Sequence, residues 1–447
     1  MRTLLLLTVV FGSLPIILIQ PFIGLLVYSW LAYMRPLDMV WGQVPKLSLF
    51  VALALTVGMV LATGREKWIT AGPQTSLLIA FGGWFGLASL MAIDPSLSTE
   101  WTIRIAKILL ISLLTTGLVR TEGRFRLLFL VVAFSLGLLG LKYGIYGLAR
   151  GGSRITSGPG GFMIDSNSFA MALNMAIPLL VGISLVERHK LIRAAAIVSG
   201  FGSAAAILFT FSRGGLITLT IVVVFILARS GRPILVALVL SIAMAGFFAT
   251  ISPDFEKSYA ERAGTIATYE EESSAVTRIH EWGVALMISK DYPLLGVGPN
   301  NLLLVRAFYP VHPDDLDSGR VTHNSFLQML VATGLPGFIL FTSALIVSFL
   351  RLEKLRRTSS KQWVRTYASM MQGSIVAYSA GGMFLDMAYF DLIYHLVGMS
   401  VSLEVAASAA LEHSTKTQTP GSDQPWWRQS APKERPISSR DYRALGQ

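Results

Sequence analysis

Residues Leu127–Leu148 have the sequence LLFLVVAFSLGLLGLKYGIYGL, in which Lys142 is the single charged side chain. A helix that crosses a bilayer needs about 20 mainly apolar residues, since every backbone polar group in hydrocarbon must be bonded within the helix. This stretch therefore predicts a membrane-spanning helix. Similar runs recur along the 447 residues, of which 53% are hydrophobic and only 14% charged, with a mean hydropathy of +0.59.

The apolar runs predict an all-α, polytopic integral membrane protein with about twelve transmembrane helices. The first run is counted as one crossing, interrupted by Pro15 and Pro21, and it has no convincing signal-peptide cleavage site. The runs are Thr3–Met34, Leu47–Ala62, Thr75–Ile93, Thr102–Val119, Leu127–Leu148, Phe169–Val186, Ala194–Phe211, Gly214–Ala228, Ile234–Ile251, Leu335–Leu350, Tyr367–Phe384 and Leu392–Ala410.

Basic residues gather at every second connection between these runs, around Arg65, Arg124, Lys190, Arg229 and the link 351–365. Short connections rich in lysine and arginine remain on the cytoplasmic side of a membrane. The pattern predicts that these connections and both termini are cytoplasmic. It also explains the net charge of +11 without a nucleic-acid partner, because the basic residues lie in short links.

The connection 252–334 differs from the rest of the chain, because up to Thr322 it holds eleven acidic and six basic residues. An acidic balance in a basic membrane protein favours an external loop. Within it, Glu270–Trp282 predicts a capped, amphipathic helix, so we expect the loop to be structured. The expected division is an N-terminal helix bundle (1–251), the loop with short helices (252–334), C-terminal helices (335–410) and a disordered cytoplasmic tail (411–447).

His323 is the leading candidate for a reactive group, because it lies where the external loop returns to the membrane. The chain has no cysteine, so catalysis must use oxygen or nitrogen groups. An imidazole, with an unperturbed pKa of about 6.5, can accept a proton near neutral pH. His280, His312 and His395 also lie on or near the outer side, and helix capping is an alternative role for His323.

Two arginines are candidates for binding an anion. Arg213 lies at the outer end of a predicted span, where the positive-inside tendency would not place it, and Gly214 next to it would allow a ligand close approach. Arg278 lies in the external loop, and its guanidinium could hold phosphate oxygens bidentately. The alternatives are an interfacial residue for Arg213 and a solvated charge for Arg278.

Three further cations lie near the predicted outer ends of spans: Arg104, Lys107 and Lys142. Cations within a membrane are costly and usually face a cavity or a partner. We therefore expect them to line a cleft for an anionic substrate, although pairing with carboxylates such as Glu100 is an alternative.

Other polar motifs predict structure rather than chemistry. Asp165–Asn167 and Gly296–Asn301 have the composition of helix caps and turns. Asp314–Asp317 could bind a divalent cation, but a solvated acidic turn is the favoured interpretation.

Several of these motifs together resemble the O-antigen ligase family, a polytopic superfamily that also includes O-antigen polymerases and O-glycosylation ligases. The motifs that carry the resemblance are Ser212-Arg213-Gly214, Thr277-Arg278 with Trp282, Gly296-Val297-Gly298-Pro299-Asn300, His323-Asn324-Ser325 and Thr333-Gly334-Leu335-Pro336-Gly337. In the N-terminal third, Gln20–Gly24 and Tyr33–Pro36 look like the branch called exosortase-associated O-glycosylation ligases.

The resemblance implies a glycosyltransferase at the periplasmic face of the bacterial inner membrane. It would transfer O-polysaccharide from undecaprenyl pyrophosphate to a lipid A-core sugar hydroxyl, without a metal or other cofactor. His323 would be the base, Arg213 and Arg278 would bind the pyrophosphate, and Asn324 would contact substrate. Polymerisation of O-antigen or protein O-glycosylation could use the same donor, and a transporter or flippase is the alternative from a different class.

Overall fold

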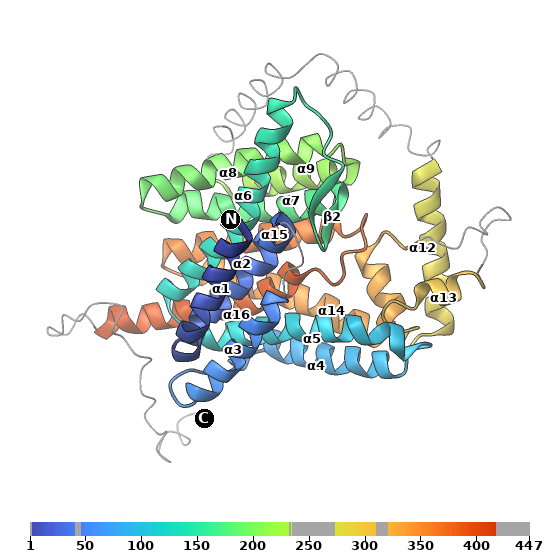
Figure 1. The fold of residues 1–447 in the computed structure, drawn as a ribbon, viewed down its shortest axis with the longest axis horizontal. Coiled ribbons are helices and arrows are strands. Elements are labelled where there is room, and N and C mark those ends of the chain that lie inside the picture. Colours follow the sequence, from blue (N-terminus) through green and yellow to red (C-terminus); the bar gives the residue numbers. More distant parts are fainter. Residues whose placement is uncertain (1, 41–45, 232–233, 235–272, 310–320, 417–447) are drawn as a thin grey trace.

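The structure is a computed structural model, and it describes residues 2–40, 46–231, 234, 273–309 and 321–416. In this part of the chain, long helices pack into a bundle, and a smaller helical unit lies at one side of it (Figure 1). Several predicted features lie outside the described residues: positions 235–251 of the ninth span, the helix start at 270–272, His312, Asp314–Asp317 and the tail from 417 onward.

The helices follow one another along the chain with one small β-hairpin between them. The elements are α1 (Arg2–Ile19), α2 (Pro21–Met34), the 3-10 helix η1 (Pro36–Met39), α3 (Leu47–Leu61), α4 (Pro73–Leu90), α5 (Pro95–Leu118), α6 (Glu122–Ala149), β1 (Ser157–Gly160), β2 (Met163–Asp165), α7 (Ser166–Val186), α8 (Lys190–Phe209), α9 (Arg213–Arg229), α12 (Ser273–Asp291), α13 (Leu302–Arg306), α14 (Ser325–Thr358), α15 (Gln362–Gly381) and α16 (Asp391–Lys416).

Within the described residues, seven helices are long and apolar enough to cross a membrane: α1, α5, α6, α7, α8, α14 and α16. The stretch Leu127–Leu148, for example, lies wholly within α6. These helices confirm the prediction of a helical, polytopic membrane protein. The total of about twelve crossings stays a prediction, as does the side of the membrane on which each connection lies.

Three local features differ from the predicted spans. The first run is divided at Gln20 into α1 and α2, because Pro21 has no N–H to continue the first helix and is well suited to begin the second. The antiparallel hairpin β1–β2 departs from an all-α chain. At the C-terminus, α16 continues to Lys416, into the tail that was predicted to be disordered.

Small residues allow close helix packing in the bundle. A Cβ atom added to Gly144 in α6 would lie 2.4 Å from the carbonyl oxygen of Gly202 in α8. Lipid is as apolar as leucine, so helices in a membrane gain from such close van der Waals contact rather than from escaping water. Helix α7 packs against α6 and α8 and also contacts α15. It is among the most buried of the candidate spans.

Connections predicted to share the cytoplasmic side are joined by ion pairs. Arg124, in the first turn of α6, pairs with Glu66, in the link after α3, at 2.6 Å. Arg229, at the end of α9, pairs with Glu353, near the end of α14, at 3.0 Å. The first pair joins two of the basic links, and the second joins the end of α9 to the last turns of α14.

The smaller unit consists of α12 and α13, and it packs on the first part of α14 (Figure 1). A buried ion pair joins the two helices: the Arg306 guanidinium and the Glu281 carboxylate are 2.6 Å apart, and both side chains are at most 3% exposed. Removing one partner of such a pair leaves a buried charge and costs about 3–5 kcal/mol. A helix predicted in the connection 252–334 is thus present from Ser273 onward, and this ion pair holds it to α13.

Candidate functional site

The site forms where α14 begins. Asn324 is the N-cap of this helix, and its side-chain oxygen accepts hydrogen bonds from the backbone N–H groups of Phe326 and Leu327, at 2.9 and 3.2 Å. His323 precedes the cap and has a positive φ of 47°. That left-handed conformation is uncommon for residues other than glycine, asparagine and aspartate. Capping therefore belongs to Asn324, and the imidazole is left free of that role.

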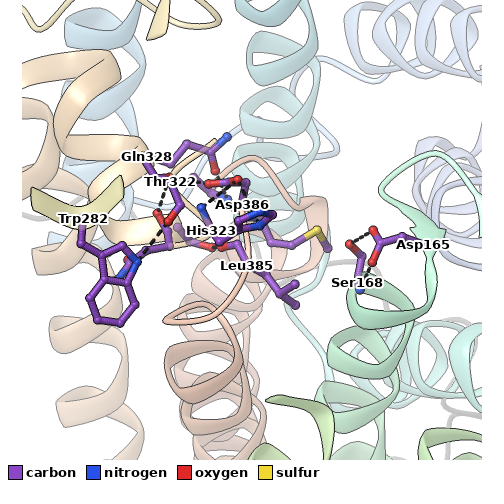
Figure 2. Close-up of polar contacts among 12 residues, drawn as sticks. Asp165, Ser168, Trp282, Thr322, His323, Gln328, Leu385 and Asp386 are labelled. Atoms are coloured by element: carbon purple, nitrogen blue, oxygen red, sulfur yellow. Dashed lines mark hydrogen bonds and ion pairs between the residues drawn. The ribbon is translucent and has the colours of Figure 1, made fainter. Parts of the chain in front are cut away.

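Asp386 is the partner of His323. Its carboxylate accepts hydrogen bonds from the backbone N–H of His323, at 3.0 Å, and from the Thr322 hydroxyl. The imidazole Nδ1 lies 3.9 Å from Asp386 Oδ2, and the two side chains are 42% and 17% exposed (Figure 2). A carboxylate at this distance can orient the imidazole and stabilise the cation formed when it takes a proton.

The segment that carries Asp386 is fixed against the first turns of α14. The backbone N–H of Ser325 donates to the Gly382 carbonyl at 2.7 Å, and the Ser325 hydroxyl donates to the Leu385 carbonyl at 2.7 Å. The backbone N–H of Ala388 donates to the side-chain oxygen of Gln328 at 3.0 Å. These bonds hold His323 and Asp386 together although they lie 63 positions apart in the chain.

Helix α12, which carries Arg278, is docked beside the His323 segment. The indole N–H of Trp282 donates to the Thr322 carbonyl at 3.0 Å, so α12 is docked beside His323 (Figure 2). Arg278 lies four residues before Trp282, and side chains four positions apart share one face of a helix. The half-buried Arg278 therefore lies on the face of α12 that meets the His323 segment.

Arg213 begins α9 beside the segment that carries Asp386. The Ser212 hydroxyl caps this helix by accepting a hydrogen bond from the Gly215 N–H at 3.0 Å. A Cβ atom added to Gly214 would lie 3.3 Å from the Cβ of Phe384, two residues before Asp386. Contacts thus connect the starts of α9 and α14, with α12, around one end of the bundle.

Arg104 lies between two aromatic rings. Its guanidinium carbon is 4.9 Å from the ring centre of Trp101 and 4.6 Å from that of Phe162, which lies in the turn of the β-hairpin. Arg104 and Lys107 also lie close enough to Asp391 to interact with its carboxylate electrostatically. The nearby carboxylate is therefore one distant in sequence, whereas the sequence suggested Glu100.

Lys142 is exposed, and its ammonium lies 5.5 Å from the ring centre of Tyr143, its neighbour on α6. None of the contacts within the described residues joins Lys142 to His323. Of the six predicted substrate-binding residues, Asn324 adjoins His323 in the chain, and Arg278 lies on the helix whose Trp282 bonds to Thr322. Arg213 begins the helix that contacts Phe384, near Asp386. Arg104 and Lys107 both lie near Asp391, and within the described part of the chain Lys142 contacts none of these residues.

The other histidines differ from His323 in their surroundings. His395 is 2% exposed within α16, where its two ring nitrogens lie 2.8 Å from the Tyr33 hydroxyl and 2.9 Å from the Thr115 hydroxyl. A ring that is enclosed in this way cannot meet a substrate. His280 lies on α12, four residues before Val284 of the small core in this unit, and His312 is outside the described residues.

A pocket opens beside the His323–Asp386 pair, with about 100 Å³ of free space. The Gly296–Asn301 motif forms part of its wall. The backbone N–H groups of Val297 and Gly298 donate to the carbonyls of Val331 and Ala332, at 2.9 and 3.2 Å. At Gly298, where φ is +96°, a Cβ atom would lie 2.2 Å from that of Ala92, so only glycine fits there. The motif is a turn that shapes the pocket, in agreement with the sequence-based interpretation.

Asp386 is the residue that sequence reasoning missed. A single aspartate in a connection between helices carries no periodic signal that sets it apart from other acidic residues. The available sign was its position just after Gly381-Gly382, where a helix ends and a polar residue must occupy a short connection.

Comparisons with known proteins give two matches to family models. A family described as O-Antigen ligase matches residues 198–342, a range that includes Arg213, Arg278 and His323. A family of unknown function (DUF5935) matches residues 1–181, which include Trp101 and Arg104. No curated protein matches the chain significantly.

Proposed function

We propose that the chain is a lipid-linked glycan ligase, because residues 198–342 match the family described as O-Antigen ligase, as the motifs predicted. The donor is O-polysaccharide on undecaprenyl pyrophosphate, and the acceptor is a sugar hydroxyl of lipid A-core. The reaction takes place at the periplasmic face of the bacterial inner membrane. The observation that carries the proposal is the His323–Asp386 pair, with Arg278 and Arg213 on neighbouring helix starts.

The residues suit the bond changes of this transfer. The oxygen of the acceptor hydroxyl attacks the anomeric carbon of the donor sugar, and the bond between that carbon and the pyrophosphate oxygen breaks. The proton of the acceptor hydroxyl goes to the His323 imidazole. Asp386 balances the charge of the resulting imidazolium. The departing pyrophosphate gains negative charge, which the guanidinium groups of Arg213 and Arg278 stabilise. Attack opposite the leaving group inverts the anomeric centre, and the donor lipid lies between the spans.

The acceptor distinguishes this ligase from related enzymes with the same donor. The purified protein, supplied with lipid-linked O-polysaccharide, is offered lipid A-core, a second lipid-linked glycan and a serine-rich protein in separate reactions. We expect the mass of lipid A-core alone to increase by the mass of the glycan. An increase on the lipid-linked glycan would indicate a polymerase, an increase on the protein a protein O-glycosylation ligase, and no increase on any acceptor would contradict the proposal.

Replacing Asp386 by asparagine should slow transfer about tenfold. The change removes the charge that faces the imidazole, and a pair of charges about 4 Å apart near a protein surface is partly screened by water. Initial rates at saturating substrates measure the effect. Thr322→Val is the matched control, because it removes a hydrogen bond to the same carboxylate but keeps the charge. An equal loss in both variants would mean that Asp386 acts only by holding the loop.

A further inference from the structure

The pocket beside His323 and Asp386 combines aromatic rings with several polar groups, of which only the Asp386 carboxylate carries a charge among the described lining residues. Trp101 and Tyr389 form one wall, with ring centres 4.9 Å apart and an angle of 49° between the rings. The polar side chains on its lining are those of Asn300, Thr322, Gln328 and Asp386. Ligand pockets that are mainly apolar, with a few polar groups fixed in place, bind small molecules in a defined orientation.

The charge of the described lining residues disfavours a phosphate group. No lysine or arginine is among the described residues that line the pocket, whereas Asp386 contributes a carboxylate. Among these residues a pyrophosphate would meet a like charge and no cation. The pocket is therefore suited to an uncharged ligand that carries hydroxyl groups, and the anionic part of the donor must lie elsewhere.

Tyr389 carries an unused hydrogen-bonding group on this wall. The side chain is 3% exposed, and its hydroxyl has no hydrogen-bond partner among the described residues. Burial and the nearby Asp386 carboxylate raise the pKa of the Tyr389 phenol, so that the hydroxyl remains a neutral donor. A buried polar group without a partner is costly, and a ligand that accepts a hydrogen bond from it would recover that cost.

Gln328 adds a second donor. Its side-chain oxygen already accepts the hydrogen bond from the Ala388 backbone, so the amide NH₂ group is the donor that this lining side chain contributes. The Arg104 guanidinium packs on Trp101, 4.9 Å from its ring centre. The rings offer flat apolar surfaces, and Tyr389 and Gln328 offer donors, a combination that matches a sugar ring with its C–H faces and hydroxyl groups.

We propose that this pocket is the acceptor subsite, in which Trp101 and Tyr389 bind one sugar ring of the acceptor glycan. The inference rests on the proposed glycan transfer and assigns its acceptor side. The sugar in the pocket directs its hydroxyl at the His323–Asp386 pair, and the donor pyrophosphate lies outside, at Arg213 and Arg278. The N-terminal part of the chain, which supplies Trp101, thereby selects the acceptor.

Tyr389→Phe is the sharpest test, because it removes only the hydroxyl. Loss of an unpaired buried hydroxyl does not weaken the fold, so any effect on the acceptor is an effect on binding. In the full-length protein we expect the acceptor KM to rise several-fold while the donor KM is unchanged. For Trp101→Ala we expect a rise of about tenfold, from loss of an aromatic surface, and for Trp101→Phe a smaller one.

A binding measurement separates this inference from the proposed reaction. Titration of the protein with the core oligosaccharide released from lipopolysaccharide, without donor, reports on the pocket alone. Weaker binding to Tyr389→Phe and Trp101→Ala supports the subsite even if no transfer occurs. Absence of binding to the unaltered protein, unchanged binding in both variants, or a rise in the donor KM instead would overturn it.

Discussion

The His323→Asn variant is expected to transfer glycan about 10²- to 10⁴-fold more slowly than the unaltered protein, which is the usual contribution of a positioned base. Asparagine tolerates the positive φ of 47° found at this position, so the backbone is not strained by the change. The backbone N–H that donates to Asp386 is also retained. The substitution thus removes the proton acceptor and little else.

Initial rates of glycan transfer measure this effect, with the thermal unfolding midpoint as a check on folding. His189→Asn is the matched control, since His189 is an exposed residue just before α8, near the basic end of the bundle. We expect its rate to be that of the unaltered protein. A His323→Asn variant that retains most of its activity would show that another group accepts the proton.

The apolar runs predicted the helices because hydrocarbon leaves the backbone few alternatives to a helix. The ends of helices were harder to predict, since these depend on contacts between distant segments. At Gly334, where φ is +66° and ψ is −174°, the backbone is not helical, so α14 consists of two helical parts joined at a kink. The second part follows Gly334, in agreement with the span predicted from Leu335. The first part was not predicted; it begins at Ser325, which is bonded to Gly382 and Leu385 of the α15–α16 connection. Local hydropathy does not contain this information.

The sequence predicted the site residues that are unusual for their position in the chain. His323 and Arg213 stood out because a histidine at the membrane boundary and an arginine at an outer helix end are uncommon. Asp386 and the residues of the pocket walls did not stand out in the sequence. Trp101 and Tyr389, for example, are far apart in the chain and meet only in the folded protein. Arg104 shows the same limit, since its partners Phe162 and Asp391 lie far from it in sequence.

Replacing Arg278 by glutamine should lower kcat for transfer about 10²- to 10³-fold, as expected when one preorganised donor to a developing negative charge is lost. Arg278 lies on the face of α12 that Trp282 docks beside His323, where the leaving pyrophosphate would be close to the base. Arg278→Lys keeps the charge but loses the bidentate fork, so we expect it to recover only part of the rate. Arg213→Gln should have a similar effect and raise the donor KM.

If both guanidinium groups hold one pyrophosphate, the double variant loses less than the product of the two single losses, because the second change acts on a group already displaced. Rates of the four proteins, measured at several donor concentrations, test this coupling. Arg150→Gln is the control, since Arg150 is an exposed arginine at the end of α6 that stacks on Tyr146. If the loss of rate in the double variant equals the product of the two single losses, the two arginines do not share a ligand. If both single variants keep the unaltered rate, neither arginine belongs to the donor site.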